Sequence, residues 1–197
     1  MTVPRASELG GSKLRLMIEG PVVTTPRLLL RPWAHGDRTP FALMNADPVV
    51  MEYFPRLLTT GESESLVDRY VESWQLGYGL WAVERSDEGQ FIGFIGFSQP
   101  SWSAPFTPCI EIGWRLCAAS WGQGFATEGA EAALVWGAQN VEFPSGEVVS
   151  FTTRVNLRSR RVIEKLGFSR DERDDFDHPL VVDGPLRPHV LYRRRMT

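Results

Sequence analysis

The chain has 197 residues, of which 43% are hydrophobic and 23% charged, a composition typical of one globular domain. Its 21 basic and 24 acidic side chains give a net charge of −3, which argues against a nucleic-acid partner because such proteins usually carry a basic excess. No apolar run approaches the roughly 20 residues that a membrane helix needs, and charges interrupt the first 20 residues, so we expect no membrane partner and no secretory signal.

The beginning of the chain is expected to lie outside the folded domain. Gly10, Gly11 and Ser12 predict a flexible tail or linker over residues 1–24, and a short extra strand over 14–18 is the alternative. Residues 25–197 are expected to form a single domain.

Two helices are predicted after a first strand over 27–33, where a short apolar run lies between prolines. Asp37 stands where a helix N-cap is expected, and the Asp47-Pro48 pair ends that helix because proline disfavours α geometry in the residue before it. A second helix is predicted over 61–77, with apolar residues at helical spacing.

The remaining pattern is typical of a mixed α/β sheet, because consecutive strands joined by a hairpin turn precede strand–helix–strand units. Gly93 and Gly96 in the second hairpin strand predict the close approach of another backbone or a bulge. The later elements are predicted as strands over 80–85, 91–97, 109–116, 147–153, from 168 and over 190–195, helices over 125–138 and 159–166, and a polar excursion over 171–188.

The cysteines are expected to be free. Cys109 and Cys117 fall on one predicted strand, where eight steps of about 3.3 Å separate them by about 26 Å. A disulfide requires Cα atoms within about 7 Å, so free thiols and a cytoplasmic location are expected. The three histidines and two cysteines show no metal-ligand spacing, so no metal site is expected.

The stretch from residue 110 to 131, IEIGWRLCAASWGQGFATEGAE, is the first candidate site. A strand, a turn with two glycines and a helix of small residues would aim unpaired backbone amides and the positive end of a helix dipole at one spot, which suits a phosphate. The alternative is a plain strand–turn–helix that uses glycine for turning. The stretch is neither a P-loop nor a Rossmann fingerprint, because the residues that define those motifs are missing.

The second candidate stretch is TRVNLRSRRVIEKLGF, over residues 153–168. Asn156 ends a strand and Ser159 begins a helix, so Asn156 can bond to a neighbouring backbone or to a ligand amide. The alternative is that Asn156 or Ser159 serves as an N-cap.

Together the two stretches resemble the GNAT superfamily of N-acetyltransferases, and most closely its RimJ/RimL branch, the ribosomal-protein N-terminal alanine acetyltransferases and their relatives. The resemblance spans residues 25–195 and rests on TPRLLLRPW, EIGWRL, WGQGFATEGA and NLRSRRVIEKLGF in that order. It implies a mixed, mostly antiparallel α/β sheet of about seven strands that splays in the middle and is flanked by helices. It also implies transfer of an acetyl group from acetyl-CoA to a primary amine, on a protein N-terminus or a small molecule, by direct transfer and without a metal.

The resemblance also implies which residues bind acetyl-CoA. Backbone groups of the splayed strand would pair with the pantetheine arm, the glycine turn would hold the pyrophosphate, and Asn156 and Arg158 would contact the pantetheine and the adenosine 3′-phosphate. The backbone set is Ile112, Trp114 and Leu116 on the strand and Trp121, Gly122, Gln123, Gly124, Phe125 and Ala126 in the turn.

For the chemistry, Glu111 on the splayed strand is the candidate base, against the alternative of an exposed strand glutamate. Family members place a tyrosine where this chain has Ile163, so the usual acid is missing. The branch suggests Ser159 as the proton donor instead. The missing tyrosine keeps open a non-catalytic acyl-CoA-binding sensor with the same fold.

The acceptor site is expected between the early helices and the loops, lined by Tyr53, Phe54 and Trp102. Asp174, Asp175 and Asp177 are candidates for attracting a cationic acceptor, against the alternative of a solvated acidic loop. A homodimer is compatible with the family, but no surface pattern specifies one.

Overall fold

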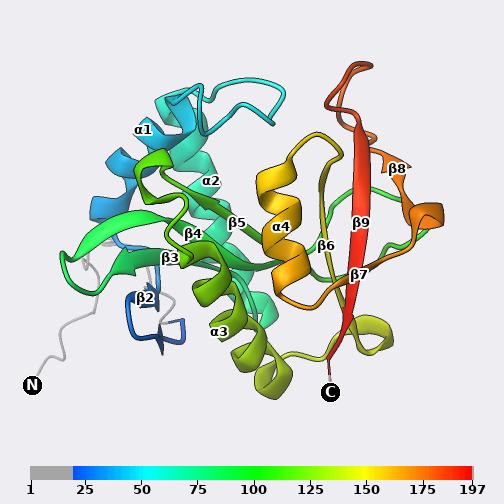
Figure 1. Cartoon of the computed structure of the whole chain (residues 1–197). Helices are drawn as coiled ribbons and strands as arrows, with labels where there is room; N and C mark the ends of the chain where they lie inside the picture. Colours follow the sequence, from blue (N-terminus) through cyan, green and yellow to red (C-terminus); the bar gives the residue numbers. More distant parts are fainter. Residues whose placement is uncertain (1–19, 197) are drawn as a thin grey trace, which may run out of the picture.

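The computed structural model describes residues 20–196, which form a nine-stranded sheet in the order β1-β2-β3-β4-β5-β6-β9-β7, with β8 also paired to β9 (Figure 1). All neighbouring strands are antiparallel except β5 and β6. The strands are β1 (Val23–Thr24), β2 (Leu28–Arg31), β3 (Leu80–Arg85), β4 (Gln90–Ser98), β5 (Glu111–Leu116), β6 (Glu147–Thr153), β7 (Ser169–Arg170), β8 (Phe176–Asp177) and β9 (Pro188–Arg195). The predicted mixed α/β sheet is confirmed. It has nine strands rather than the expected seven or so, because three of the strands are only two residues long. The extra strand considered at 14–18 lies outside the described residues.

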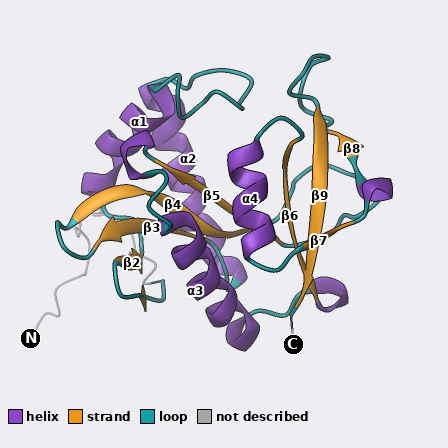
Figure 2. Ribbon diagram, viewed as in Figure 1, coloured by secondary structure: helices purple, strands orange, loops and turns teal. Residues whose placement is uncertain are grey.

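Helices cover both faces of the sheet (Figure 2). The helix α1 (Arg38–Ala46) and the helix α2 (Thr60–Ser73) pack through one apolar cluster onto one face of β3 and β4. The helix α3 (Phe125–Asn140) covers the other face of β2, β4 and β5, and α4 (Leu157–Lys165) lies beside α3 against β6. None of the helices in residues 20–196 has the length and apolar character required to cross a bilayer.

The ends of α1 and α2 follow from local chemistry. Asp37 occupies the N-cap position of α1 as predicted, and α1 ends before Asp47, whose ψ of 115° is extended. The Thr59 hydroxyl of α2 accepts from Glu62 N while the Glu62 carboxylate accepts from Thr59 N, a reciprocal capping box. The Asp37 carboxylate makes no capping bond to α1 and instead accepts from Ala34 N and Arg31.

Small residues let α3 lie close to the sheet. A Cβ on Gly129 would approach Ile95 Cδ1 to 2.5 Å, and Ala130 and Ala133 are fully buried. The predicted close approach at Gly93 is also present, because a Cβ there would meet Arg115 O at 2.1 Å. The tight packing holds the N-terminus of α3 at the end of β5.

The sheet divides between β5 and β6. The two strands share a single residue pair, Glu111 with Val149, and two further bonds close to it, Val149 N to Ile110 O and Ser150 Oγ to Ile112 O, both 3.0 Å. Beyond this point β5 runs toward the α3 turn while β6 diverges from it (Figures 1 and 2). The expected splay is therefore present and begins at Glu111.

The far half of the sheet is covered by loops rather than by α1 and α2. The rings of Phe106, Phe151 and Phe176 lie within 6.1 Å of one another, centre to centre, and join the loop before β5, the strand β6 and the excursion over 171–188. Trp102 packs against all three rings and against His178. These contacts anchor the excursion onto the sheet.

Candidate active site

The turn before α3 presents free backbone amides. Gly122 and Gly124 have φ values of 74° and 83°, the left-handed region that glycine adopts without a steric penalty. The first helical bond of α3 runs from Glu128 N to Gly124 O, so the amides of Phe125, Ala126 and Thr127 have no partner in residues 20–196. Together with the helix dipole, these amides form a site suited to an anion.

Arg27 lies beside this turn and was not predicted as a site residue. Its guanidinium donates from Nη1 to Gln123 O at 2.9 Å, pairs with Glu128 and lies over the Phe125 ring. The bond joins residues 96 positions apart, so no local pattern could have revealed it. Arg27 adds a cation next to the free amides, and its side chain is half-exposed.

The edge of β5 offers unpaired backbone groups to the gap. Cys117 N donates a backbone hydrogen bond to Ile92 O of β4. In an antiparallel pair, only every second residue of a strand forms backbone hydrogen bonds with the same neighbouring strand. Ile112, Trp114 and Leu116 therefore direct their backbone groups toward β6. Past Ile112 the strand β6 has diverged, which leaves Trp114 N free within the described residues. An extended ligand can pair with this edge as a strand would.

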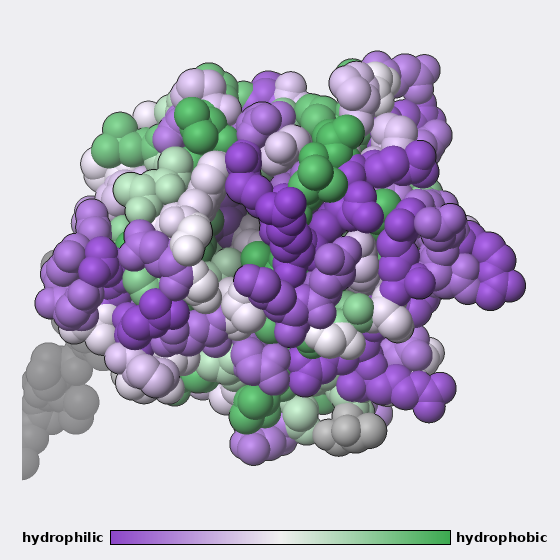
Figure 3. Space-filling view, viewed as in Figure 1, coloured by the Kyte–Doolittle hydropathy of each residue, from purple (hydrophilic) through white to green (hydrophobic). Residues whose placement is uncertain are grey.

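Trp121 and Arg158 bridge the mouth of the gap. Trp121 Nε1 donates to Leu116 O at 2.8 Å, and the Arg158 guanidinium lies 4.6 Å from the centre of a Trp121 ring. Arg158 also pairs with Glu52 and lies 5.5 Å from the Tyr53 ring. Figure 3 shows hydrophilic side chains over much of the face of the molecule that carries α4, with hydrophobic ones in smaller groups. Val155 and Leu157, close to Arg158 in the chain, are exposed and apolar. An anion that reached Arg158 would compete with Glu52.

At the start of α4, Asn156 is the N-cap, the structural alternative considered from the sequence. Its Oδ1 accepts from Ser159 N at 3.1 Å and its Nδ2 donates to Thr152 Oγ1 at 3.1 Å. The Ser159 hydroxyl has no hydrogen-bond partner among the described residues and stays available to a ligand. Ile163, at the position of the family's tyrosine, is fully buried and contributes to the core.

Glu111 stands where the gap opens, with its carboxyl group partly buried. Burial raises the pKa of Glu111 to about 8, although a hydrogen bond from Ser98 Oγ, 3.5 Å away, opposes the shift. A carboxyl group with this pKa exchanges a proton near neutral pH, as a general base must. The interpretation of Glu111 as a mere exposed strand residue does not fit this environment.

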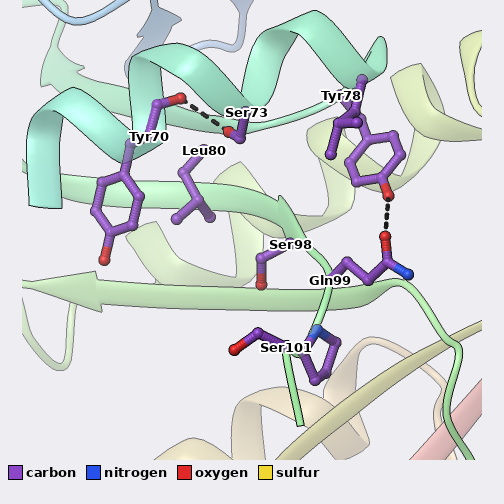
Figure 4. Close-up of a pocket in the computed structure, with 9 residues that line it drawn as sticks. Tyr70, Ser73, Tyr78, Leu80, Ser98, Gln99 and Ser101 are labelled. Carbon is purple, nitrogen blue, oxygen red and sulfur yellow. Dashed lines mark hydrogen bonds between the residues drawn. The ribbon is translucent and has the colours of Figure 1, made fainter.

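Ser98 also lines a depression of about 370 Å³ between the end of α2 and the strands β3 and β4 (Figure 4). Its walls carry no charged side chain and are mostly apolar, with polar groups from Tyr70, Tyr78 and Gln99. Tyr70 extends from α2 toward the strands, and Tyr78 donates to Gln99 at 3.5 Å (Figure 4). This depression lies next to Glu111 and is a candidate path for an acceptor.

Of the residues predicted for the acceptor, Phe54 lies closest to charged groups of β5, with its ring centre 4.0 Å from the Arg115 guanidinium carbon. Tyr53 faces Arg158 at the mouth of the gap. Trp102 is instead held in the aromatic cluster of the loops. The structure thus brings Phe54 and Tyr53, but not Trp102, to the edges of the gap and of β5.

The acidic residues of the excursion do not form an open cation-binding cluster. Asp174 pairs with Arg193 at 2.8 Å, Asp175 pairs with Arg170, and Asp177 lies 3.7 Å from Arg187. Their charges are compensated internally, so the proposed attraction of a cationic acceptor finds no support. Within residues 20–196 no group of three or more potential ligand side chains could hold a metal ion.

Comparison with known proteins identifies the family. The model described as "Acetyltransferase (GNAT) domain" matches residues 27–169. The uncharacterized protein YkkB of Bacillus subtilis is 31% identical over 148 residues, which cover 74% of this chain and 83% of that protein. The chain therefore belongs to the GNAT acetyltransferase family and is an N-acetyltransferase.

Two further relatives bear on the proposals below. The FsC-acetyl coenzyme A-N(2)-transacetylase of Aspergillus fumigatus is 29% identical over 184 residues, which cover 85% of this chain and 74% of that enzyme. A structure of RimL, the ribosomal L7/L12 alpha-N-protein acetyltransferase, in complex with coenzyme A covers 89% of this chain and 98% of its own, with a TM-score of 0.72 and 15% identity. The RimL likeness shows the shared fold alone.

Proposed function

We propose that this enzyme transfers the acetyl group of acetyl-CoA directly to a primary amine, either of a protein N-terminus or of a small molecule. The observation that carries the proposal is the gap between β5 and β6, which has Glu111 at its closed end and the free amides of α3 at the other. This arrangement fits a long ligand with a phosphate at one end and a reactive group at the other. The RimJ/RimL branch remains a prediction, because it rests on motifs rather than on close relatives.

The residues present fit the cosubstrate. Amides of Gln123 to Ala126, with Arg27 beside them, suit the pyrophosphate, and the free edge of Trp114 and Leu116 suits the pantetheine amides. Arg158 pairs with Glu52 through Nη2 and is half-exposed, so its other N–H groups can face a phosphate, and Asn156 contributes through its cap of α4. The fit is supported by the backbone N–H groups along this path that have no hydrogen-bond partner within the described residues.

Acetyl-CoA supplies an acyl group activated as a thioester. Glu111 would accept the proton that the acceptor ammonium loses, directly or through a water, and free the nitrogen lone pair for attack on the carbonyl carbon. Trp114 N can donate to the carbonyl oxygen as negative charge develops there. The attacking nitrogen loses its second proton as the amide forms, and Ser159 Oγ or a water accepts it while giving a proton to the departing sulfur. The sulfur needs little help because a free thiol has a pKa of about 8.5. The new bond is the amide C–N bond and the broken bond is the C–S bond.

The relatives support this class of reaction without fixing the acceptor, since one is named for a transacetylase acting at N(2) and another for a ribosomal-protein acetyltransferase. The free cysteines fit a cytoplasmic enzyme. We propose no metal, nucleic-acid or membrane partner, and a homodimer remains open.

The test is release of free CoA from acetyl-CoA in the presence of peptide and small-molecule amines, with mass spectrometry of the acceptor. We expect CoA release that depends on an amine and an acetylated nitrogen in the product. Binding of acetyl-CoA without CoA release for any amine would contradict the proposal and favour the acyl-CoA-binding sensor.

A further inference from the structure

One face of β5 carries two ionisable residues separated by a glycine. Glu111, Gly113 and Arg115 alternate along the strand and face α1 and α2, because side chains of a strand point to opposite sides in turn. Gly113 has no side chain, and a Cβ there would meet only Glu111 Oε1, at 3.8 Å. The face therefore has an open floor with a carboxyl group at one end and a guanidinium at the other.

Arg115 has no acidic partner among the described residues. Its Nη1 donates to Asn45 Oδ1 at 2.6 Å, its guanidinium lies over the rings of Phe54 and Phe94, and its buried Nε has no hydrogen-bond partner. Burial lowers the pKa of Arg115. The guanidinium is thus partly desolvated with its charge uncompensated.

The contact with Asn45 does not neutralise this charge. Asn45 is fully buried, and its Nδ2 donates to Ser63 Oγ at 3.1 Å, so its uncharged carboxamide is oriented by the helices. A buried cation without a counterion is costly unless an anion completes the site. The arrangement holds the guanidinium in place and leaves donors free.

Tyr70 connects the two ends. The Tyr70 ring centre lies 5.4 Å from that of Phe94, and the Arg115 guanidinium carbon lies 5.5 Å from the same Phe94 ring. Burial raises the pKa of Tyr70. Tyr70 also lines the depression that reaches Ser98 beside Glu111 (Figure 4). The depression therefore ends at Ser98 beside the candidate base, and its wall residue Tyr70 packs against the same Phe94 ring as the unpaired guanidinium.

We propose that Arg115 binds a carboxylate of the acceptor, so that the substrate is a small amino-carboxylic compound with its amine at Glu111. Four residue steps along the strand separate the Cα atoms of Glu111 and Arg115 by about 13 Å. This spacing fits an amine several bonds from its carboxylate, as in a dipeptide, better than an α-amino acid. The inference rests on the proposed function and narrows its acceptor class.

The experiment compares dipeptides with their C-terminal amides, which keep the same α-amino group and differ in the charge at the other end. In the wild type we expect kcat/KM for the carboxylates to exceed that for the matched amides by about tenfold or more, mainly through KM. The ratio should fall to near 1 in Arg115→Gln. It should also fall in Asn45→Asp, which gives the guanidinium an internal carboxylate while keeping the side chain's shape. Arg56→Gln, which removes an exposed arginine paired with Glu62, should keep the wild-type ratio.

Melting temperatures of the enzyme–CoA complex with the same compounds give a readout that does not need turnover. The carboxylates should raise the melting temperature more than the amides in the wild type and in Arg56→Gln, but not in Arg115→Gln or Asn45→Asp. Equal effects of both members of each pair, in turnover or in binding, overturn the inference, as does a wild-type preference that survives both site variants. Acetylation of amides alone overturns the inference but leaves the proposed function standing, whereas failure of every amine to release CoA counts against the proposed function.

Discussion

The charged residues of the excursion over 171–188 and those of β5 differ in whether they have partners of opposite charge. In the excursion over 171–188, Asp174 and Asp175 form ion pairs with arginines. On the α2-facing side of β5, neither Glu111 nor Arg115 has an oppositely charged partner in the part of the chain that the structure describes. The excursion is the more acidic in sequence, yet β5 carries the reactive groups.

The difference shows that compensation, rather than the number of charges, separates a structural region from a functional one. The ion pairs of the excursion satisfy both partners within the chain and leave no uncompensated charge for a ligand. An uncompensated carboxyl group with a raised pKa costs folding free energy and is retained where chemistry needs it.

Glu111→Gln should reduce activity more than any other substitution considered. Removing the only proton acceptor that we assign should lower kcat by about 100-fold or more, with little change in acetyl-CoA affinity. Steady-state CoA release and acetyl-CoA titration measure the two effects. Glu88→Gln, in an exposed turn pair with Arg85, is the control and should retain activity. A Glu111→Gln enzyme with near-normal kcat would show that another group or water alone serves as the base.

Glu111 should also make stability depend on pH. Its folded pKa of about 8 lies above the value of 4.5 for the unfolded chain, so the folded state binds the extra proton between these values. This contribution to the free energy of unfolding is fully present below about pH 4.5 and is lost as pH rises through about 8. Denaturant unfolding at pH 6 and pH 9 should show a larger loss for the wild type than for Glu111→Gln. Parallel losses in both proteins would place the carboxyl group in contact with water.

Gly124→Val tests the anion site at the other end of the gap. The φ of 83° disfavours any Cβ, so the turn must rearrange and misplace its amides. We expect acetyl-CoA affinity to fall by about tenfold or more. Gly77→Val is a matched control, because its φ of 84° imposes the same strain away from the gap and a Cβ there meets nothing within 4 Å. Equal affinity losses in both variants would assign the effect to strain rather than to the amides.

Ser159→Ala should lower kcat by a few-fold, because water can replace the hydroxyl as proton donor. The cap of α4 uses Ser159 N, which alanine retains, so the melting temperature should stay close to that of the wild type. A loss of stability with normal kcat would point to a structural role for the hydroxyl.

Asp174→Asn removes one ion pair of the excursion and should have the smallest effect on stability and activity. The pair with Arg193 is partly exposed, so its loss should change the free energy of unfolding by at most about 1 kcal/mol and leave kcat and acceptor KM unchanged. A marked rise of acceptor KM would restore the excursion as a docking region for a cationic acceptor.

Local patterns in the sequence predicted the elements well. The strand over 147–153 is observed with the predicted bounds, because hydrophobic periodicity is encoded by neighbouring residues. The helix α4 begins two residues earlier than predicted, since Asn156 rather than a later residue caps it. The turn of α3 was also found, because glycines beside a run of small residues carry its geometry.

Side-chain partners distant in sequence could not be predicted. Arg115 meets Asn45 across 70 positions, and Arg27 reaches Gln123 across 96. Whether a charge is compensated depends on such pairs. Sequence alone therefore suggested Asp174 and its neighbours as ligand-binding candidates and missed Arg115.

The central claim is that acetyl-CoA occupies the gap between β5 and β6, and its most direct test is the melting temperature with acetyl-CoA, CoA and NAD. At about 100 times its dissociation constant a ligand adds roughly 2.7 kcal/mol, a rise on the order of 5–10 °C for a chain of this size. We predict a rise with acetyl-CoA and CoA but not with NAD, kept in Glu111→Gln and reduced in Gly124→Val. No rise at millimolar acetyl-CoA, or an equal rise in Gly124→Val, would contradict this account.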